Sequence, residues 1–291
     1  MSCGKLLAVA LAGVPAIGFA EGADGRAGRT GFWLDNRISR NWRAPINRPP
    51  LNRDELLDDK DYYDEDYLSS MAADGVNGLW IPVRLEELSG SPSRKAKLAS
   101  IVRKARSHGI GIWLMMNEPE CVAPDDRRVS EHPEWFAPGP VWWDRLLWCP
   151  SSKAALSRVR ELTANIFRSV PDLSGIINIS HGEGLTTCLS LLAPCDVSYP
   201  DGIRCSACAA RPPWQLHADL ATAMVEGMRE GNPSARLLSW LYQPEADEAR
   251  RDWVRDCAAH LPDGVTLVYN FESGSVREQK GRRHVGGDYW L

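Results

Sequence analysis

The sequence lacks the features of proteins that bind nucleotides or nucleic acids. It has no Gly-x-x-x-x-Gly-Lys loop and no Gly-x-Gly-x-x-Gly turn that opens a helix after a strand, so the common phosphate cradles are absent. Its 38 acidic and 34 basic residues give a formal net charge of −4, and no basic stripe recurs with the aromatic residues. Because proteins that follow a phosphate backbone carry such a stripe, we expect no nucleic-acid partner and no nucleotide cofactor for catalysis.

Long apolar runs are also missing. The N-terminal run Leu6–Ala20 is interrupted by Gly13 and Pro15, and no later run reaches the roughly 18 residues that suggest a membrane span. We therefore expect no membrane-spanning segment. Residues 1–28 fit either a signal peptide or a linker, because the run closes on the small-x-small pattern Gly18-Phe19-Ala20. The first interpretation makes the protein periplasmic or secreted, and the second makes it cytoplasmic.

Phenylalanine is scarce, with five residues, whereas tryptophan is abundant, with twelve. A flat indole ring with an N–H group is what a sugar ring stacks on and bonds to. Some tryptophans lie in strand-like runs and suit a core, but three lie in a loop-like stretch, where a core role and a ligand role are both open. The loop group is Trp142, Trp143 and Trp148.

From residue 29 the chain alternates short apolar runs with amphipathic helical patterns, as βα units around a parallel sheet do. Apolar residues keep helical spacing within Leu98–Ala105, Ala155–Val170 and Leu216–Met228. The pattern predicts an α/β fold of the (β/α)₈ type, the TIM barrel. The predicted strands are Gly31–Asp35, Gly78–Val83, Ile110–Met116, Gly175–Ile179, Arg236–Tyr242, Val265–Asn270 and Val285–Leu291.

Seven strands are one fewer than a closed barrel of this type needs. Because the chain stops at Leu291 with no helix after the last run, we expect a barrel domain over residues 29–291 that is incomplete after its seventh strand. The alternative is that Leu6–Ala20 supplies a first strand. It ranks lower because the glycine-rich connection Glu21–Thr30 holds no crossover helix. A cysteine-rich loop insertion is expected at residues 184–211.

Barrel enzymes carry their reacting groups at the carboxyl ends of the strands. Glu183 follows the apolar run Ile176–Ile179 and is flanked by Gly182 and Gly184, which let a ligand approach the backbone closely. Cleavage of a glycosidic bond requires an acid for the leaving oxygen and a partner that stabilises or attacks the sugar centre. We predict that Glu183 is the general acid; the alternative is an ordinary loop glutamate.

Other polar residues end the predicted strands. Glu118, in Asn117-Glu118-Pro119, is a candidate catalytic carboxylate or an acidic residue at the start of a helix or loop. Asp35 and Arg37 end the first predicted strand and are candidate substrate-binding residues; Asp35 is either an acceptor for sugar hydroxyl groups or the ion-pair partner of Arg37. His181 either contacts the sugar or orients Glu183. Further along the same rim the candidates are the catalytic carboxylate Glu272 and the substrate-binding residue Asp288.

Four cysteines after Glu183 have the spacing Cys188-x₆-Cys195-x₉-Cys205-x₂-Cys208. The final Cys-x₂-Cys is typical of a metal knuckle, and two further thiolates complete a tetrahedral structural zinc site. Two disulfides are the alternative, favoured if the chain is exported. A catalytic metal is disfavoured because four thiolates leave no open position. Three scattered cysteines suit buried apolar positions; they are Cys121, Cys149 and Cys257.

Four segments resemble the strand order of the family 20 glycoside hydrolases, the β-hexosaminidases, and the resemblance runs from Arg29 to Leu291. These segments are Arg29–Asp35, Gly75–Trp80, Gly111–Leu114 and Ile179–Glu183. The chain is also similar to uncharacterised bacterial barrel proteins related to that family, in which Asn-Glu-Pro, a strand 4 glutamate, Thr-x-Cys and Cys-x-x-Cys recur. The resemblance implies a hexosaminidase-like hydrolase in which Glu183 is the general acid.

In that family an aspartate precedes the acid and orients the acetamido group of the substrate, which acts as the nucleophile. Gly182 stands at the matching position here. If the acetamido route is lost, a protein carboxylate must take its role, and the candidates are Glu118, Glu272 and Asp288. The resemblance also implies that Trp240 and Tyr242 line the sugar subsite.

Asn117-Glu118-Pro119 also resembles the acid motif that ends strand 4 in the large retaining glycosidase clan. That reading fits if Leu6–Ala20 is strand 1, and it makes Glu118 the acid and Glu272 the nucleophile. Both resemblances imply a glycosidase that acts on an oligosaccharide or a glycoconjugate. The alternative from another class is a catalytically inactive carbohydrate-binding barrel.

Overall fold

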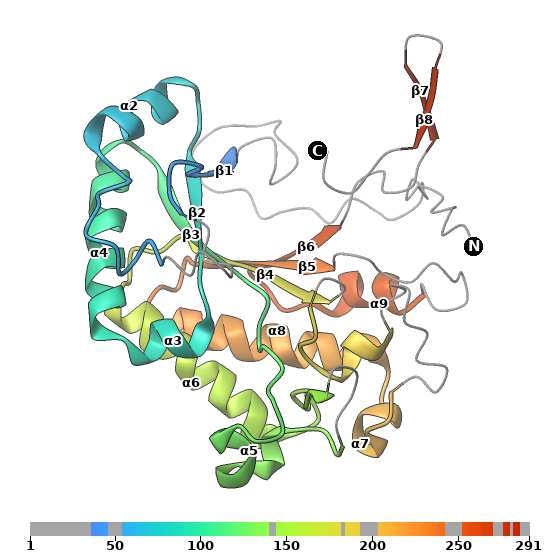
Figure 1. Cartoon of the computed structure of the whole chain (residues 1–291). Helices are drawn as coiled ribbons and strands as arrows, with labels where there is room; N and C mark the ends of the chain where they lie inside the picture. The colour runs from blue at the N-terminus through green and yellow to red at the C-terminus, as the bar shows by residue number, and fades with distance from the viewer. Residues whose placement is uncertain are drawn as a thin grey trace.

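The centre of the molecule is a parallel β-sheet of six strands in the order β1-β2-β3-β4-β5-β6 (Figure 1). Each strand pairs in parallel with the next strand along the chain, which is the pattern of a βα repeat. The strands are β1 Ile38–Arg40, β2 Gly78–Pro82, β3 Gly111–Met116, β4 Gly175–His181, β5 Arg236–Leu241 and β6 Val265–Tyr269. This α/β arrangement is consistent with part of a TIM barrel.

The computed structural model describes most of the chain between residues 36 and 285. The described residues are 36–45, 54–139, 144–181, 184–192, 203–241, 252–269, 276–279 and 282–285.

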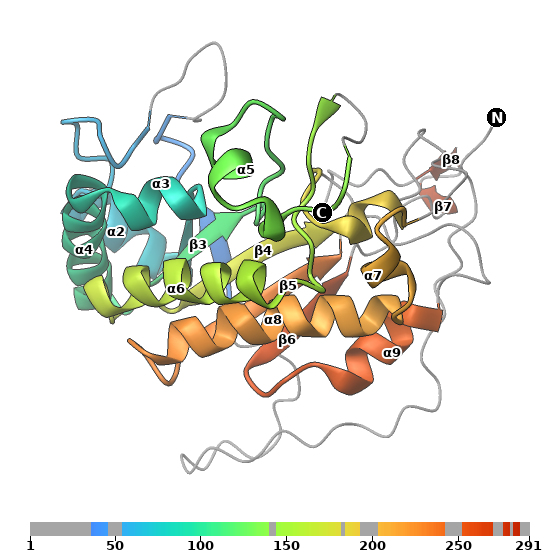
Figure 2. The same ribbon diagram turned by 90° about the horizontal axis from the view of Figure 1, so that it is seen from below.

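Helices connect successive strands and cover one face of the sheet. Figure 2 shows the two longest, α6 and α8, side by side along that face. The helices are α2 Glu65–Ala73, α3 Leu85–Gly90, α4 Pro92–Ser107, α5 Arg127–Glu131, α6 Lys153–Ser169, α7 Ser206–Ala209, α8 Pro213–Arg229 and α9 Asp252–His260, with 3₁₀ turns η1 Pro133–Trp135 and η3 Cys188–Leu192.

Both faces of the sheet are apolar, as barrel strands require. Alternate residues of β3, such as Ile112 and Leu114, belong to the core beneath the helices. Trp113 between them points to the opposite face and packs with Ile177 and Leu238. In a closed barrel this opposite face is the inside. Trp113 is a core residue there, and Trp80 and Trp240 are partly buried against it.

A glycine closely follows the end of two of the connecting helices. α2 ends at Ala73 and is followed by Gly75 with φ +80°, and α4 ends at Ser107 and is followed by Gly109 with φ +72°. Only glycine adopts this left-handed conformation without a steric cost, so the chain turns sharply from each helix into the next strand.

The five predicted strands from Gly78 to Asn270 are confirmed as β2 to β6, with ends that differ by at most two residues. The predicted strand Gly31–Asp35 lies outside the described residues, and the strand that pairs with β2 is Ile38–Arg40. Residues 1–28 and the alternative first strand Leu6–Ala20 also lie outside the described residues. Within the described part of the chain, no helix combines the length and apolarity that crossing a membrane requires.

The interpretation of Val285 as the start of a seventh parallel strand is wrong. Val285 ends β8 (Arg282–Val285), which pairs antiparallel with β7 (Val276–Gln279) in a separate two-stranded sheet. Figure 1 shows this hairpin apart from the main sheet. Two residues, Lys280-Gly281, separate the strands, which is the spacing of a tight hairpin. The rest of the predicted strand, residues 286–291, lies outside the described residues.

Close packing of α6 on α8 makes Gly227 a test of the fold. A Cβ at Gly227 would lie 2.4 Å from the carbonyl oxygen of Arg160, so Gly227→Ala forces the two helices apart. We expect a loss of about 1–3 kcal/mol in the free energy of unfolding, measured by urea denaturation. The matched control is Gly90→Ala in α3, where a Cβ meets nothing within 4 Å. Equal stability of Gly227→Ala and wild type would contradict this helix packing.

Candidate active site

The chain that leaves β3 is held against β4 by one side chain. The backbone N–H of Glu118 donates to Oδ1 of Asn178 at 2.8 Å, and Nδ2 of Asn178 donates to the carbonyl oxygen of Glu118 at 2.8 Å. Asn178 lies within β4 and is buried. These two bonds fix Glu118 at the carboxyl end of β3, the edge of the sheet where barrel enzymes place reacting groups.

The carboxyl group of Glu118 is buried and bonded on both oxygens. Oε1 accepts the N–H of Leu85, the first residue of α3, and Oε2 accepts the N–H of Glu120, each at 2.8 Å. Burial raises the pKa of Glu118 to about 7, although the two hydrogen bonds act to lower it. A carboxyl group with this pKa exchanges its proton near neutral pH, as a general acid or base does.

A small cavity of about 120 Å³ adjoins the Glu118 carboxyl group. Ligand pockets usually start at roughly 300 Å³, so this cavity does not enclose a sugar ring. The side chains that line it come from the start of α3, the segment after β3, and α6; they include Arg84, Glu86, Glu120, Arg128, Trp148 and Leu162.

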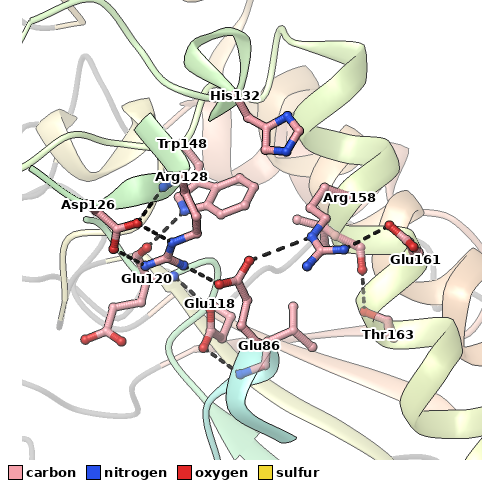
Figure 3. A network of polar contacts seen from close by, with 12 residues as sticks. Glu86, Glu118, Glu120, Asp126, Arg128, His132, Trp148, Arg158, Glu161 and Thr163 are labelled. Atoms are coloured by element: carbon pink, nitrogen blue, oxygen red, sulfur yellow. Dashed lines mark hydrogen bonds and ion pairs between the residues drawn. The ribbon is translucent and has the colours of Figure 1, made fainter. Parts of the chain in front are cut away.

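A network of ion pairs surrounds the cavity (Figure 3). Arg128 bonds Glu86 at 2.5 Å and Asp126 at 2.7 Å, and Glu86 also lies 3.7 Å from Arg158. The hydrogen bonds from Arg128 lower the pKa of Asp126 to about 2. Two arginines therefore compensate Glu86, which lines the cavity from α3, and one of them also compensates Asp126 at the start of α5.

Trp148 forms one wall of the cavity. Its indole Nε1 donates to the carbonyl oxygen of Glu120 at 2.9 Å, and its ring stacks on Trp135 with centroids 5.4 Å apart. The sequence leaves open whether Trp148 packs in the core or contacts a ligand. Its side chain is buried, which favours the core role. Trp142 and Trp143 lie outside the described residues.

The residues that flank positions 182–183 lie beside the Glu118 segment. A Cβ at Gly184 would lie 3.4 Å from Nδ2 of Asn117, and the N–H of Cys121 donates to the carbonyl oxygen of Leu185 at 3.0 Å. The chain that follows Glu183 therefore runs alongside Asn117 to Cys121. Several predicted site residues lie outside the described residues: Asp35, Glu183, Tyr242, Glu272 and Asp288.

His181 ends β4 after a bulge between Ile179 and His181. Its ring is fully buried, edge-on to Trp253 of α9, with centroids 5.5 Å apart. Burial lowers the pKa of His181 to about 4, so the ring is neutral at pH 7. His181 has no exposed surface from which to contact a sugar, and its role in orienting Glu183 stays a prediction.

Arg37 is predicted at the carboxyl ends of the strands but lies at their amino ends. It precedes β1, and its N–H donates to Oδ1 of Asn77 at 2.7 Å, just before β2 begins. The amino ends of the strands meet there, so Arg37 does not lie on the rim with the other candidates.

The arginine at the carboxyl end of β1 is instead Arg40, which sequence reasoning missed. It is buried, with its guanidinium 5.1 Å from the ring centre of Trp80 on the neighbouring strand. The three-residue strand that places it is too short to show a clear period of alternation. Trp240 is half-buried against the same apolar face, and its contact with a sugar remains a prediction.

Four buried cysteines converge beside the cavity wall: Cys149, Cys188, Cys205 and Cys208. Their sulfur atoms all lie within 4.8 Å of one another, and none of the described cysteines forms a disulfide. The expectation that Cys149 is a scattered apolar residue is wrong, because its Sγ lies 3.5 Å from that of Cys208. Hydrogen bonds from Cys188 and Cys208 lower the pKa of the Cys149 thiol. Cys195 lies outside the described residues.

Comparison with known proteins does not assign a family. No protein-family model matches the chain, and no curated protein matches it. Solved structures similar to it include a family 5 glycoside hydrolase from Prevotella bryantii, with a TM-score of 0.43 and 13% identity over 72% of this chain and 54% of that one.

Two further similar structures are glycosidases by their descriptions. A broad-specificity endoglucanase from an uncultured bacterium has a TM-score of 0.45 and 11% identity, over 72% of this chain and 57% of that one. A family 36 α-galactosidase from Geobacillus stearothermophilus has a TM-score of 0.40 and 13% identity, over 73% of this chain and 29% of that one. This chain spans at most 57% of the length of these three structures. Similarity at this level assigns no activity.

The raised pKa of Glu118 predicts an unusual pH dependence of stability. Its pKa is about 7 in the folded state against an ordinary value of 4.5, so between these values the folded state binds the proton more tightly than the unfolded chain. The contribution of Glu118 to the free energy of unfolding therefore falls as the pH rises from about 4.5 to about 7. Glutamine does not titrate, so the stability of Glu118→Gln relative to wild type should rise across that window.

The measurement is urea denaturation of both proteins at a series of pH values across the window. A stability difference that does not change with pH would contradict the raised pKa of Glu118.

Proposed function

We propose that this protein is a glycoside hydrolase whose carboxyl pair is Glu118 and Glu183. The observation that supports this most is the buried Glu118 carboxyl, with a pKa of about 7, at the carboxyl end of β3. The contact of Gly184 with Asn117 supports it too, since the residue that follows Glu183 in the chain lies beside the residue that precedes Glu118. Cleavage of a glycosidic bond requires two carboxyl groups that flank the bond.

Glu183 is the general acid in this proposal. It donates a proton to the glycosidic oxygen while the bond between that oxygen and the anomeric carbon breaks. Glu118 acts on the other side of the sugar: as a nucleophile it attacks the anomeric carbon, and as a base it takes a proton from the attacking water. The first mechanism needs the two carboxyl groups about 5 Å apart, and the second needs more than about 6.5 Å.

The two roles also have an alternative assignment. A pKa of about 7 leaves Glu118 partly protonated at neutral pH, which suits a proton donor, and Glu272 is then the nucleophile. The hexosaminidase-like version of the proposal, in which the acetamido group of the substrate attacks, requires another residue in place of the aspartate that Gly182 replaces.

A catalytically inactive carbohydrate-binding barrel is the second candidate. It is favoured by the hydrogen bond from the N–H of Leu85, which makes the Glu118 carboxyl a structural cap for α3, and by the bond from the N–H of Glu120, which occupies the other oxygen. The small size of the cavity favours it as well. In this case Trp240 and Tyr242 contact an oligosaccharide and no bond is cleaved.

The test is hydrolysis of a panel of aryl glycosides by wild type, Glu183→Gln and Glu118→Gln. The variant of the proton donor should lose about 10²–10⁴-fold in rate on substrates with poor leaving groups and much less on those with activated leaving groups. The variant of the nucleophile should lose activity on both kinds. Comparing the N-acetylglucosaminide with its des-acetyl counterpart shows whether the acetamido group takes part.

The matched control is Glu226→Gln, which removes a half-exposed carboxylate on α8 that pairs with Arg160. Its rates should equal those of wild type. If wild type binds oligosaccharides but cleaves no glycoside in the panel, the hydrolase proposal fails and the binding barrel stands.

A further inference from the structure

An isolated parallel β-bridge brings Cys149 and Cys188 together. Trp148 forms a parallel bridge with Thr187, and the N–H of Cys188 donates to the carbonyl oxygen of Trp148 at 3.2 Å. The next residues on the two segments are Cys149 and Cys188. Residues that follow a parallel bridge lie next to each other, so the connection before α6 and the loop after β4 meet at these cysteines.

A short helix supplies the other two cysteines. Cys205 immediately precedes α7 and Cys208 lies within it, and the N–H of Cys208 donates to the carbonyl oxygen of Cys205 at 3.1 Å. This single turn directs both sulfur atoms of the Cys-x₂-Cys pair toward Cys149. The pair therefore has the arrangement of a metal knuckle.

The distances between the sulfur atoms fit a metal ion better than disulfides. Cys149 Sγ lies 3.5 Å from Cys208 Sγ and 3.7 Å from Cys205 Sγ, and all four sulfurs lie within 4.8 Å of one another. Four sulfurs at about 2.3 Å from a tetrahedral zinc ion are about 3.8 Å apart. The sulfurs of a disulfide are about 2.05 Å apart.

We propose that Cys149, Cys188, Cys205 and Cys208 bind one structural zinc ion. All four side chains are buried, and four thiolates close the coordination sphere, which leaves no position for a reacting water. Ser151 Oγ lies 3.2 Å from Cys208 Sγ and accepts a hydrogen bond from Arg211 at 3.3 Å. Arg211, which also pairs with Asp219, holds Ser151 beside Cys208, as outer hydrogen bonds around a metal site do.

The ion would also fix one wall of the Glu118 cavity. Trp148 directly precedes Cys149, and its indole bonds the carbonyl oxygen of Glu120, whose N–H bonds the Glu118 carboxyl. The zinc site thus holds the segment that carries this tryptophan. The assignment of zinc itself does not rest on the proposed glycosidase activity.

The experiment is elemental analysis of the full chain, purified under reducing conditions without a chelator. Wild type should contain about one zinc ion per chain, as a four-thiolate site implies. Cys149→Ser should contain a small fraction of that. Two matched controls should keep the full content: Cys257→Ser, a buried cysteine near the carbonyl of Trp214, and Cys195→Ser, which the proposed ligand set omits.

A folding defect in Cys149→Ser would also lower the metal content, so wild type is tested a second way. After exchange of the ion for cobalt(II), four thiolate ligands should give intense sulfur-to-metal charge-transfer absorption and the visible bands of a tetrahedral site. Wild type without zinc or without these bands overturns the proposal. Loss of zinc from Cys195→Ser with retention in Cys149→Ser overturns the ligand set.

Discussion

The site depends on the side-chain amide of Asn178. This one group accepts from the backbone N–H of Glu118 and donates to its carbonyl oxygen, so the segment after β3 cannot shift relative to β4 without breaking two buried hydrogen bonds. With the backbone of Glu118 held in this position, its carboxyl group accepts hydrogen bonds from the N–H groups of Leu85 and Glu120. A buried carboxyl group with both oxygens bonded, and a pKa near neutrality, is the result.

From Glu118 the contacts continue without a break to the cysteines. Glu120 bonds the Glu118 carboxyl through its N–H and the indole of Trp148 through its carbonyl oxygen. Trp148 in turn pairs with Thr187, and Cys149 and Cys188 follow these two residues along the chain. The proposed catalytic carboxyl and the proposed zinc site are therefore two parts of one connected structure at the carboxyl ends of β3 and β4.

The sequence predicts the parts of this structure that depend on local pattern. Strands β2 to β6 follow from short apolar runs bounded by turn residues, and Glu118 follows from its place after such a run. The environment of Glu118 could not be predicted, since its carboxyl bonds Leu85, which lies 33 residues earlier in the chain. Cys149 cannot be predicted for the same reason: it lies 59 residues from Cys208, and spacing within one loop does not reveal such a partner. Arg37 differs from its predicted position because the strand that pairs with β2 begins after it, at Ile38.

Titration of the Glu118 carboxyl itself tests the central claim of this account most directly. Carbon-13 NMR of the full chain with labelled glutamate side chains follows each carboxyl group, and the signal that is missing in Glu118→Gln identifies Glu118. The account predicts a midpoint at a pH of about 7. A midpoint near the ordinary glutamate value of about 4.5 would contradict it and leave Glu118 as a structural cap for α3.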